Sequence, residues 1–285
     1  MKSLIPSLVL KELHPNEIAW LESTFCRFNN QYPSLEELWK LMDEVWDQLN
    51  CDPEIFDNRI TRFYNHPIWL LNGLFIEHHE ISLMYRRIFT KWIVKHSPQR
   101  VADYGGGFGT LARMIGQALP STMVEVIEPY PHPAAVALAA QTANVRYCQD
   151  LNGSYDVIIA TDVFEHVSDP LGLVFQTAQH LKPAGYYLIA NCFYPVIRCH
   201  LPQTFHFRFT WNTILENMGL IPIEPVAYGH AFQRNNELSL SNARKLEKES
   251  IRLFSFSKNL PNFVNKFLWT LYLKMKLEND NSVEC

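Results

Sequence analysis

RVADYGGGFG, residues 100–109, is the stretch that decides the fold of this 285-residue chain. An apolar run ends on Asp103, and glycine then recurs at every second position, at Gly105, Gly107 and Gly109. Residues 110–119 follow with apolar side chains at helical spacing, which predicts a strand, a glycine turn and a helix. Glycine is needed in such a turn where the backbone has positive φ or where a ligand approaches the bare main chain.

The spacing of the glycines separates two classes of ligand. A dinucleotide turn has the pattern G-x-G-x-x-G, but counting from Gly105 places Thr110 at the last glycine position. The pattern present is Asp103-x-Gly105-x-Gly107-x-Gly109, which resembles the D/E-x-G-x-G-x-G first motif of the class I S-adenosylmethionine (SAM)-dependent methyltransferases. The resemblance implies that SAM is the cofactor and that these four residues bind it. The same spacing disfavours a dehydrogenase.

Residues 98–234 continue as alternating strands and helices, which predicts a parallel sheet covered on both faces. The expected later strands are Met123–Ile127, Val145–Cys148, Tyr155–Ala160, Tyr186–Ala190, and a closing antiparallel pair at Leu220–Val226 and Ala231–Arg234. A helix over Pro170–Leu181 and the turn Lys182–Gly185 precede the fifth strand, in an order similar to that of the family. The expected fold is therefore α/β: a doubly wound, seven-stranded, mostly parallel sheet of the SAM methyltransferase type.

The resemblance also assigns side chains to the cofactor. Glu128 follows the second strand, where the family has an acid that accepts hydrogen bonds from both ribose hydroxyls, as two carboxylate oxygens can. Asp150 and Leu151 follow the third strand and are expected at the adenine, although Asp150 with the next residues, Asn152-Gly153, also fits a plain turn. Pro129 and Asp162 complete the expected cofactor set.

The fourth strand runs into Asp162–Val167, DVFEHV, which is similar to a segment with an "EH" pair in the small-molecule branch of the family. Ligands of open α/β sheets lie at the carboxyl ends of the strands, so this segment faces the methyl group. His166 is the candidate general base because imidazole exchanges protons near neutral pH. A purely pocket-shaping role is the alternative. Glu165 is expected to cap or anchor the segment.

The segment Asn191–Thr210 after the fifth strand is too rich in aromatic residues and histidine for a plain loop. His200 and His206 are weaker candidates for the base, or for a metal site together with His166. No metal is predicted, because no carboxylate or thiolate spacing supports a site beyond Cys199. The residues expected to line the acceptor pocket are Tyr85, Phe193, Tyr194 and Phe205.

Residues 1–97 predict a helical cap that forms a lid over the substrate, and residues 235–285 predict a helical extension. In the cap, Ser34 and Glu37 form a capping-box pattern, and Asn72-Gly73 is expected to break the chain before a long helix over Leu74–Lys95. In the extension, helices are expected over Leu238–Ser257 and Phe263–Leu277. These helical parts also offer surfaces for a homodimer.

The composition sets limits on partners and location. A formal net charge of −4 and a pI near 6.3 give no global electrostatic reason to bind nucleic acid, so no DNA partner is expected. The first ten residues lack the pattern of a signal peptide, and the six cysteines are scattered. No apolar run is long enough for a transmembrane segment. A cytoplasmic location is expected.

The sequence thus predicts a SAM-dependent methyltransferase that transfers a methyl group in line to an oxygen or nitrogen of a small metabolite. Two alternatives stay open: a methyltransferase acting on a peptide, protein or RNA, and a non-catalytic module of the same fold that binds a partner. Retention of Asp103, the three glycines and Glu128 disfavours the module, because a decayed site tends to lose the residues nearest its ligand.

Overall fold

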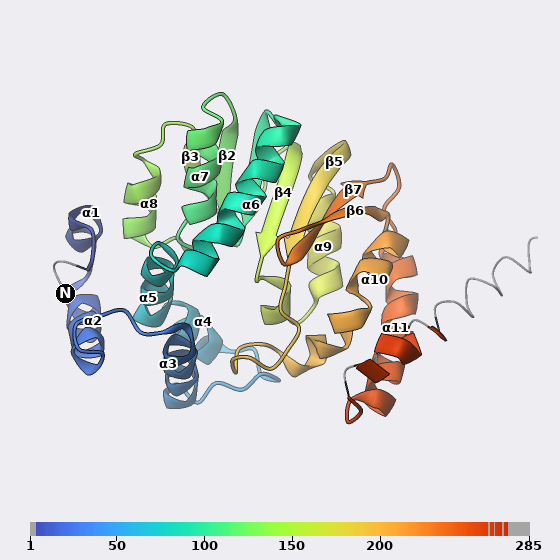
Figure 1. Cartoon of the computed structure of the whole chain (residues 1–285), viewed down its shortest axis with the longest axis horizontal. Helices are drawn as coiled ribbons and strands as arrows, with labels where there is room; N and C mark the ends of the chain where they lie inside the picture. Colours follow the sequence, from blue (N-terminus) through green and yellow to red (C-terminus); the bar gives the residue numbers. More distant parts are fainter. Residues whose placement is uncertain (1–3, 262, 265, 270, 273–285) are drawn as a thin grey trace, which may run out of the picture.

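The computed structural model describes residues 4–261, 263–264, 266–269 and 271–272, and in them a central sheet lies between two layers of helices (Figure 1). The sheet has seven strands in the order β3-β2-β1-β4-β5-β7-β6. The strands are β1 (Arg100–Tyr104), β2 (Met123–Ile127), β3 (Val145–Cys148), β4 (Tyr155–Thr161), β5 (Leu181–Ala190), β6 (Leu220–Val226) and β7 (Gly229–Arg234). Only the pairs β5–β7 and β6–β7 are antiparallel among the described strands, which confirms the predicted fold class.

The strand order reverses direction at β1, which pairs in parallel with β2 on one side and with β4 on the other. Connections therefore leave β1 and β4 in opposite directions, and a crevice at their carboxyl ends is where open α/β sheets bind ligands. The residues that follow β1, β2 and β4 in the sequence all lie at this edge.

One predicted boundary was wrong. The helix α9 ends at Ala178, and β5 already begins at Leu181, so the predicted turn Lys182–Gly185 lies within a strand. Leu181 pairs with Tyr155 of β4, and the register then shifts before Tyr186 pairs with Val157. A β-bulge therefore absorbs residues that read as a turn in the sequence.

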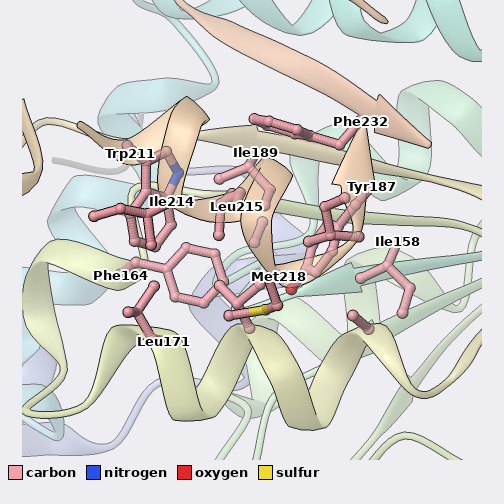
Figure 2. Packing of buried hydrophobic residues seen from close by; sticks show 14 of the residues in the cluster. Ile158, Phe164, Leu171, Tyr187, Ile189, Trp211, Ile214, Leu215, Met218 and Phe232 are labelled. Atoms are coloured by element: carbon pink, nitrogen blue, oxygen red, sulfur yellow. The ribbon is translucent and has the colours of Figure 1, made fainter. Parts of the chain in front are cut away.

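Each face of the sheet packs against its own set of helices. The first face contacts α6 (Glu80–His96) and α7 (Thr110–Ala118) through a cluster centred on Val101, Val126 and Ile159. The second face contacts α9 (Pro170–Ala178), α10 (Trp211–Met218) and α11 (Leu240–Ser257). Figure 2 shows this second core, in which the aromatic rings of Phe164 and Trp211 pack with their centroids 5.6 Å apart.

The N-terminal helices form a third apolar cluster, against which Tyr147 of β3 also packs. They are α1 (Ser7–Lys11), α2 (Pro15–Arg27), α3 (Leu35–Gln48), α4 (Asn58–Tyr64) and α5 (Pro67–Ile76). The cluster also includes Phe108 of the glycine turn, two alanines of α8 (Pro133–Ala139) and Cys199 of the loop after β5. The cap is thereby docked on the carboxyl edge of the sheet, whereas α6, the last helix before residue 98, packs on the sheet itself.

The predicted helix break at Asn72-Gly73 is not present, because both residues lie inside α5. The interruption between α5 and α6 comes later, at Glu77–His79. A Cβ atom on Gly73 would lie 2.6 Å from Cγ of Phe108. Glycine at this position therefore serves close packing against the glycine turn, a function that local sequence cannot distinguish from a helix break.

The C-terminal helix α11 confirms the prediction over Leu238–Ser257 to within two residues. The second predicted helix, Phe263–Leu277, includes positions 265, 270 and 273–277, which lie outside the described residues. None of the helices in the described ranges combines the length and apolar character that crossing a membrane requires.

The contact between α5 and the glycine turn predicts the effect of Gly73→Ala. Alanine favours a helix over glycine by about 1 kcal/mol, but overpacking of this kind costs about 1–3 kcal/mol. We expect a net loss of stability in urea unfolding, together with weaker binding of any ligand of the turn. Asn72→Ala is the matched control, since it raises helix propensity in the same helix and removes side-chain atoms where Gly73→Ala adds one. A Gly73→Ala protein as stable as Asn72→Ala would contradict the packing role.

Candidate functional site

The turn after β1 has the backbone conformation that its glycines permit. Gly105, Gly107 and Gly109 all have positive φ, at 67°, 51° and 70°. These angles lie in the left-handed region, where side chains other than glycine are strained. A Cβ atom on Gly107 would meet no atom within 4 Å, so open space lies above the backbone at this point. A ligand can therefore approach the main chain of the turn directly.

Side chains from neighbouring elements hold the turn from outside. The hydroxyl of Tyr147, in β3, donates to the carbonyl oxygen of Gly107 at 2.8 Å. The guanidinium of Arg113, in α7, donates to the carbonyl oxygen of Phe108 at 2.8 Å and also pairs with the carboxylate of Glu77. These bonds fix two carbonyls of the turn before any ligand binds.

Asp103 lies at the base of the turn and is almost fully buried, with 1% of its surface exposed. Neither carboxylate oxygen has a donor at full hydrogen-bond geometry. Burial raises the pKa of Asp103 from 3.8 to about 6, and the guanidinium of Arg86 and the backbone N–H of Ala112 oppose that shift. A buried carboxylate that keeps no partner is costly, and such a group commonly marks a place where a ligand supplies what is missing.

Glu128 and Asp150 lie at the carboxyl ends of β2 and β3, next to the turn. The main-chain N–H of Glu128 continues the sheet by donating to Cys148 at 2.9 Å. Burial raises the pKa of the Glu128 carboxyl, and the backbone N–H of Gly107 lowers it, so this carboxylate lies against the turn. Burial raises the pKa of Tyr104 most, and the charges of Asp150 and Glu128 raise it further. Both carboxylates therefore lie near the Tyr104 ring. Leu151 packs on the core beside them, and Pro129 is exposed.

Asp162 follows β4 in a strained conformation, with φ at 55°. Its main-chain N–H donates to Ala190 at 2.8 Å, and its Oδ2 accepts a hydrogen bond of 2.7 Å from the hydroxyl of Tyr228. The ring of Tyr228 contacts that of Tyr85, with centroids 4.9 Å apart. The structure thus brings two predicted site residues together through a third, Tyr228, that the sequence analysis did not single out.

The "EH" pair forms a short 3-10 helix, η1 (Phe164–His166). Glu165 anchors the loop after β5, because its Oε1 accepts from the backbone N–H of Cys192 at 2.7 Å. The Nδ1 atoms of His166 and His200 lie 3.0 Å and 2.7 Å from the carbonyl oxygens of Cys199 and Tyr194. His166 and His200 are neighbours, with ring centroids 4.9 Å apart.

Two predicted site residues are not part of this site. His206 is buried against α11, with its Nδ1 atom 3.0 Å from the hydroxyl of Ser250, and burial lowers its pKa to about 4. Phe193 is also buried, and it packs in the core against Phe207 and Trp211. Neither outcome was predicted. Phe193 lies in irregular chain, and His206 lies in the short 3-10 helix η2 (Pro202–Phe209), which the sequence pattern did not reveal.

Tyr194 and Phe205, the other two predicted pocket residues of the loop, contact the same cation. The guanidinium carbon of Arg208 lies 4.4 Å from the ring centroid of Tyr194 and 5.6 Å from that of Phe205. Their role toward an acceptor stays a prediction.

Side chains that the sequence analysis did not assign surround His166. The rings of Tyr64 and Trp69, on α4 and α5, each present an edge-to-face contact to His166 with centroids 6.3 Å apart. Trp69 Nε1 and the amide nitrogen of Asn191 are buried without a hydrogen-bond partner, as is Glu165 Oε2. Unpaired polar atoms are rare in protein interiors, so their gathering here indicates the place of a second ligand.

Comparison with known proteins assigns the fold to a family. A family model described as a methyltransferase domain matches residues 77–235, more than half of the chain. The chain belongs to the class I, SAM-dependent methyltransferase family. A curated relative, the ubiquinone biosynthesis O-methyltransferase of Albidiferax ferrireducens, is 31% identical over 160 residues, which cover 48% of this chain and 58% of the relative. The chain thus matches little more than half of that relative's length.

Solved methyltransferases have a similar arrangement at low sequence identity. An O-methyltransferase family protein from Burkholderia thailandensis is 14% identical and aligns over 70% of both chains with a TM-score of 0.49. Human N-acetylserotonin methyltransferase, solved in complex with SAM, is 16% identical, with 70% of this chain and 66% of that chain covered and a TM-score of 0.47. The family assignment rests on the domain match.

The residues of this methyltransferase fit SAM. The bare backbone of the turn leaves room above Gly107, and the unpaired Asp103 carboxylate offers negative charge to a cationic ligand. Glu128 offers two acceptor oxygens at the end of the adjacent strand, as a pair of ribose hydroxyls requires. The predicted cofactor residues thus occupy one edge of the sheet, on both sides of the glycine turn.

The buried Asp103 predicts an unusual pH dependence of stability. Its pKa in the folded chain is about 6, above the ordinary 3.8, so the folded state binds this proton more tightly than the unfolded state. Its contribution to stability is therefore present at low pH and is lost as the pH rises through about 6. A difference of one pKa unit corresponds to about 1.36 kcal/mol. The Asp103→Asn protein is therefore expected to be more stable than the wild type by about 2–3 kcal/mol near pH 7, and the difference in stability should disappear near pH 4.

Urea unfolding of the ligand-free protein at both pH values measures this difference. Asp156→Asn is the matched control of opposite sign, because a bond from Lys182 and two from backbone amides lower the pKa of Asp156 despite its partial burial. That variant should lose stability near neutral pH. An Asp103→Asn protein less stable than the wild type near pH 7 would refute the account of Asp103.

Proposed function

We propose that this protein transfers a methyl group from SAM to a hydroxyl oxygen of a small metabolite that carries a ring. The observation that supports the cofactor half of the proposal is the buried, unpaired Asp103 carboxylate beneath the open backbone of the glycine turn. The Albidiferax relative is a ubiquinone biosynthesis O-methyltransferase, which supports oxygen over nitrogen as the acceptor atom and a small molecule over a peptide, protein or RNA.

SAM supplies a methyl group on a sulfonium, which is already an activated leaving group. The chain therefore needs mainly to bind and align, and alignment alone is worth effective molarities on the order of 10⁵ M or more. Glu128 and Asp150 are proposed to hold the adenosine end of SAM, with Pro129 and Leu151 beside them. Asp103, the three glycines of the turn and Asp162 are proposed to hold the amino-acid end.

The acceptor is proposed to lie on the cap side of η1. Tyr64 and Trp69 present ring edges around His166, which suits a flat, partly apolar molecule. The unpaired Trp69 Nε1 and the amide nitrogen of Asn191 are donors that an acceptor oxygen can satisfy. Tyr85 reaches the same edge through Tyr228 and completes the proposed lining.

His166 is proposed to receive the hydroxyl of the acceptor. Its Nδ1 faces the carbonyl of Cys199, an atom that can only accept, so Nδ1 carries the hydrogen and Nε2 keeps a free lone pair. In this tautomer, Nε2 is the ring nitrogen that can accept a hydrogen bond from the hydroxyl of the methyl acceptor. A cytoplasmic location and self-association through the helical extensions stay predictions.

Calorimetric titration with SAM and with S-adenosylhomocysteine tests the cofactor half of the proposal. We expect micromolar binding by the wild type and a loss of about 10- to 100-fold in Glu128→Gln, because the amide removes charge and one acceptor from the pair of ribose bonds. Glu216→Gln, on the exposed side of α10, is the matched control. Absence of binding of both adenosyl ligands to the wild type would overturn the proposed function.

A methyl-transfer assay tests the other half of the proposal, that the acceptor atom is an oxygen of a small molecule. The protein is incubated with methyl-labelled SAM and pairs of small phenols and the corresponding anilines, and the products are identified by mass. Transfer to the phenols with little transfer to the anilines is the expected result. Transfer to the anilines alone would replace oxygen by nitrogen as the acceptor atom.

A further inference from the structure

Three side chains of the kinds that bind metals meet at the acceptor side of the site. Glu165 and His166 come from η1, and His200 comes from the loop after β5. One potential ligand atom of each lies within 4.8 Å of the others, and no second group of this kind occurs among the residues that the structure describes. The two segments are also joined by a backbone bond of 2.9 Å from Leu201 to the carbonyl of Glu165.

Both histidines have the tautomer that a metal ligand needs. Nδ1 of His166 lies 3.0 Å from a backbone carbonyl, and Nδ1 of His200 lies 2.7 Å from another. A carbonyl oxygen only accepts, so each Nδ1 carries the hydrogen, and each Nε2 keeps its lone pair for a ligand. Metal-binding histidines typically have this outer hydrogen bond, which fixes the ring and the tautomer.

Glu165 supplies the strongest indication that the cluster can bind a cation. Its side chain is fully buried, at 0% exposure. Oε1 is bonded to the N–H of Cys192, but Oε2 has no partner at all. A buried carboxylate oxygen without a donor is costly, and a cation bound by the Glu165 carboxylate and one nitrogen of each histidine would supply the partner that this side chain lacks.

We propose that Glu165, His166 and His200 bind one Zn²⁺ ion. Two nitrogens and one carboxylate are a ligand set of catalytic zinc sites, whereas Mg²⁺ and Ca²⁺ prefer oxygen ligands throughout. Ligand atoms at about 2.0–2.2 Å from Zn²⁺ in a tetrahedron lie about 3.3–3.6 Å apart, so small side-chain rotations close the observed cluster onto the ion. Glu165 was predicted to cap or anchor its segment and not to bind a metal. It precedes His166 in the sequence, and the fold brings it close to His200.

Three protein ligands would leave one position of a tetrahedron open, and the rings of Tyr64 and Trp69 contact His166, one of the three. The next step rests on the proposed function: the open position would bind the hydroxyl oxygen of the acceptor. Zn²⁺ lowers the pKa of a bound O–H group toward neutrality. The hydroxyl proton then leaves to solvent, a C–O bond forms as the C–S bond of SAM breaks, and one proton is released for each methyl group transferred. With Zn²⁺ bound, Nε2 of His166 is a metal ligand, so the acceptor hydroxyl would contact the ion in place of the direct contact with His166 that the proposed function gives for the metal-free site.

Metal titration of the wild type, without SAM, tests the proposal. The protein is dialysed against chelator and titrated with Zn²⁺ and, separately, with Co²⁺. We expect one equivalent of each metal to bind, the visible d–d bands of a four- or five-coordinate Co²⁺ site, and a higher Tm with Zn²⁺. Wild-type protein that binds no stoichiometric Zn²⁺ and yields no such Co²⁺ spectrum would overturn the proposal, and the cluster would then be a protonated Glu165 beside two neutral histidines.

Variants identify the ligands. Glu165→Gln and His200→Gln are each expected to lower Zn²⁺ affinity by at least about 100-fold, since outer-shell changes alone already cost 10- to 100-fold. His180→Gln is the matched control, because His180 also faces a backbone carbonyl through Nδ1, at 2.9 Å, but lies outside the cluster. Unchanged Zn²⁺ affinity in both ligand variants would place the metal elsewhere and refute the assignment.

SAM titration of the same samples separates the two proposals. Retained SAM binding shows that a variant is folded, and it leaves the cofactor half of the proposed function standing whatever the metal result. SAM binding together with the absence of a metal would refute the zinc site alone. Metal binding by a protein that binds no adenosyl ligand would refute the proposed function and leave the zinc site standing.

Discussion

The structure depends on a backbone that only glycine adopts easily. At the end of β1 the chain must turn sharply from strand to helix, and three residues of that turn have positive φ. The conformation is unfavourable to hold by itself, because glycine gains the most entropy on unfolding. The fold offsets this cost from outside: Tyr147 and Arg113 bind two carbonyls of the turn, and α5 packs against Phe108. Parts of the chain far apart in sequence thereby preorganise one ligand surface.

The edge of the sheet that this turn occupies is acidic. Asp103, Glu128, Asp162 and Glu165 follow or end β1, β2 and β4, and burial raises the pKa of each. Arg86 of α6 is a cation that opposes the shift for Asp103 and Asp162. Carboxylates gathered in this way repel one another and destabilise the empty protein. A ligand with positive charge relieves that repulsion, so stability was given up at the position where binding recovers it.

Sequence predicted the parts of this arrangement that are written in local patterns. The limits of β2, β3 and β6 agree with the prediction, because each is a short, mostly apolar run bounded by turn residues. The errors occur where tertiary contacts override local signals. Gly73 reads as a break but serves packing, and Lys182–Gly185 reads as a turn but extends a strand through a bulge.

The candidate site was predicted unevenly for the same reason. Motif spacing located Asp103 and Glu128, since both follow strands whose order the sequence reveals. His200 and Phe193 lie in irregular chain after β5 and His206 lies in the 3-10 helix η2, and no apolar period in this segment indicates which side chains point inward. Only the fold shows that His200 joins His166 while His206 packs against α11. Tyr64 and Trp69 were out of reach, because their contact with His166 spans about a hundred residues of sequence.

The contact of Tyr64 and Trp69 with His166 also joins two parts of the sequence that differ in their match to the family. The match to the family model begins at residue 77, so the glycine turn, Glu128 and the "EH" pair belong to the shared part, whereas Tyr64 and Trp69 do not. Cofactor binding requires the same contacts in every member, which favours a rigid sheet edge. The rings proposed to face the acceptor come from the cap, whose apolar cluster also includes Phe108 of the glycine turn. Trp69 lies on α5, the helix that packs against Phe108, so the cap links the two parts of the site. Under the proposed function, the choice of acceptor depends in part on residues that the family match does not cover.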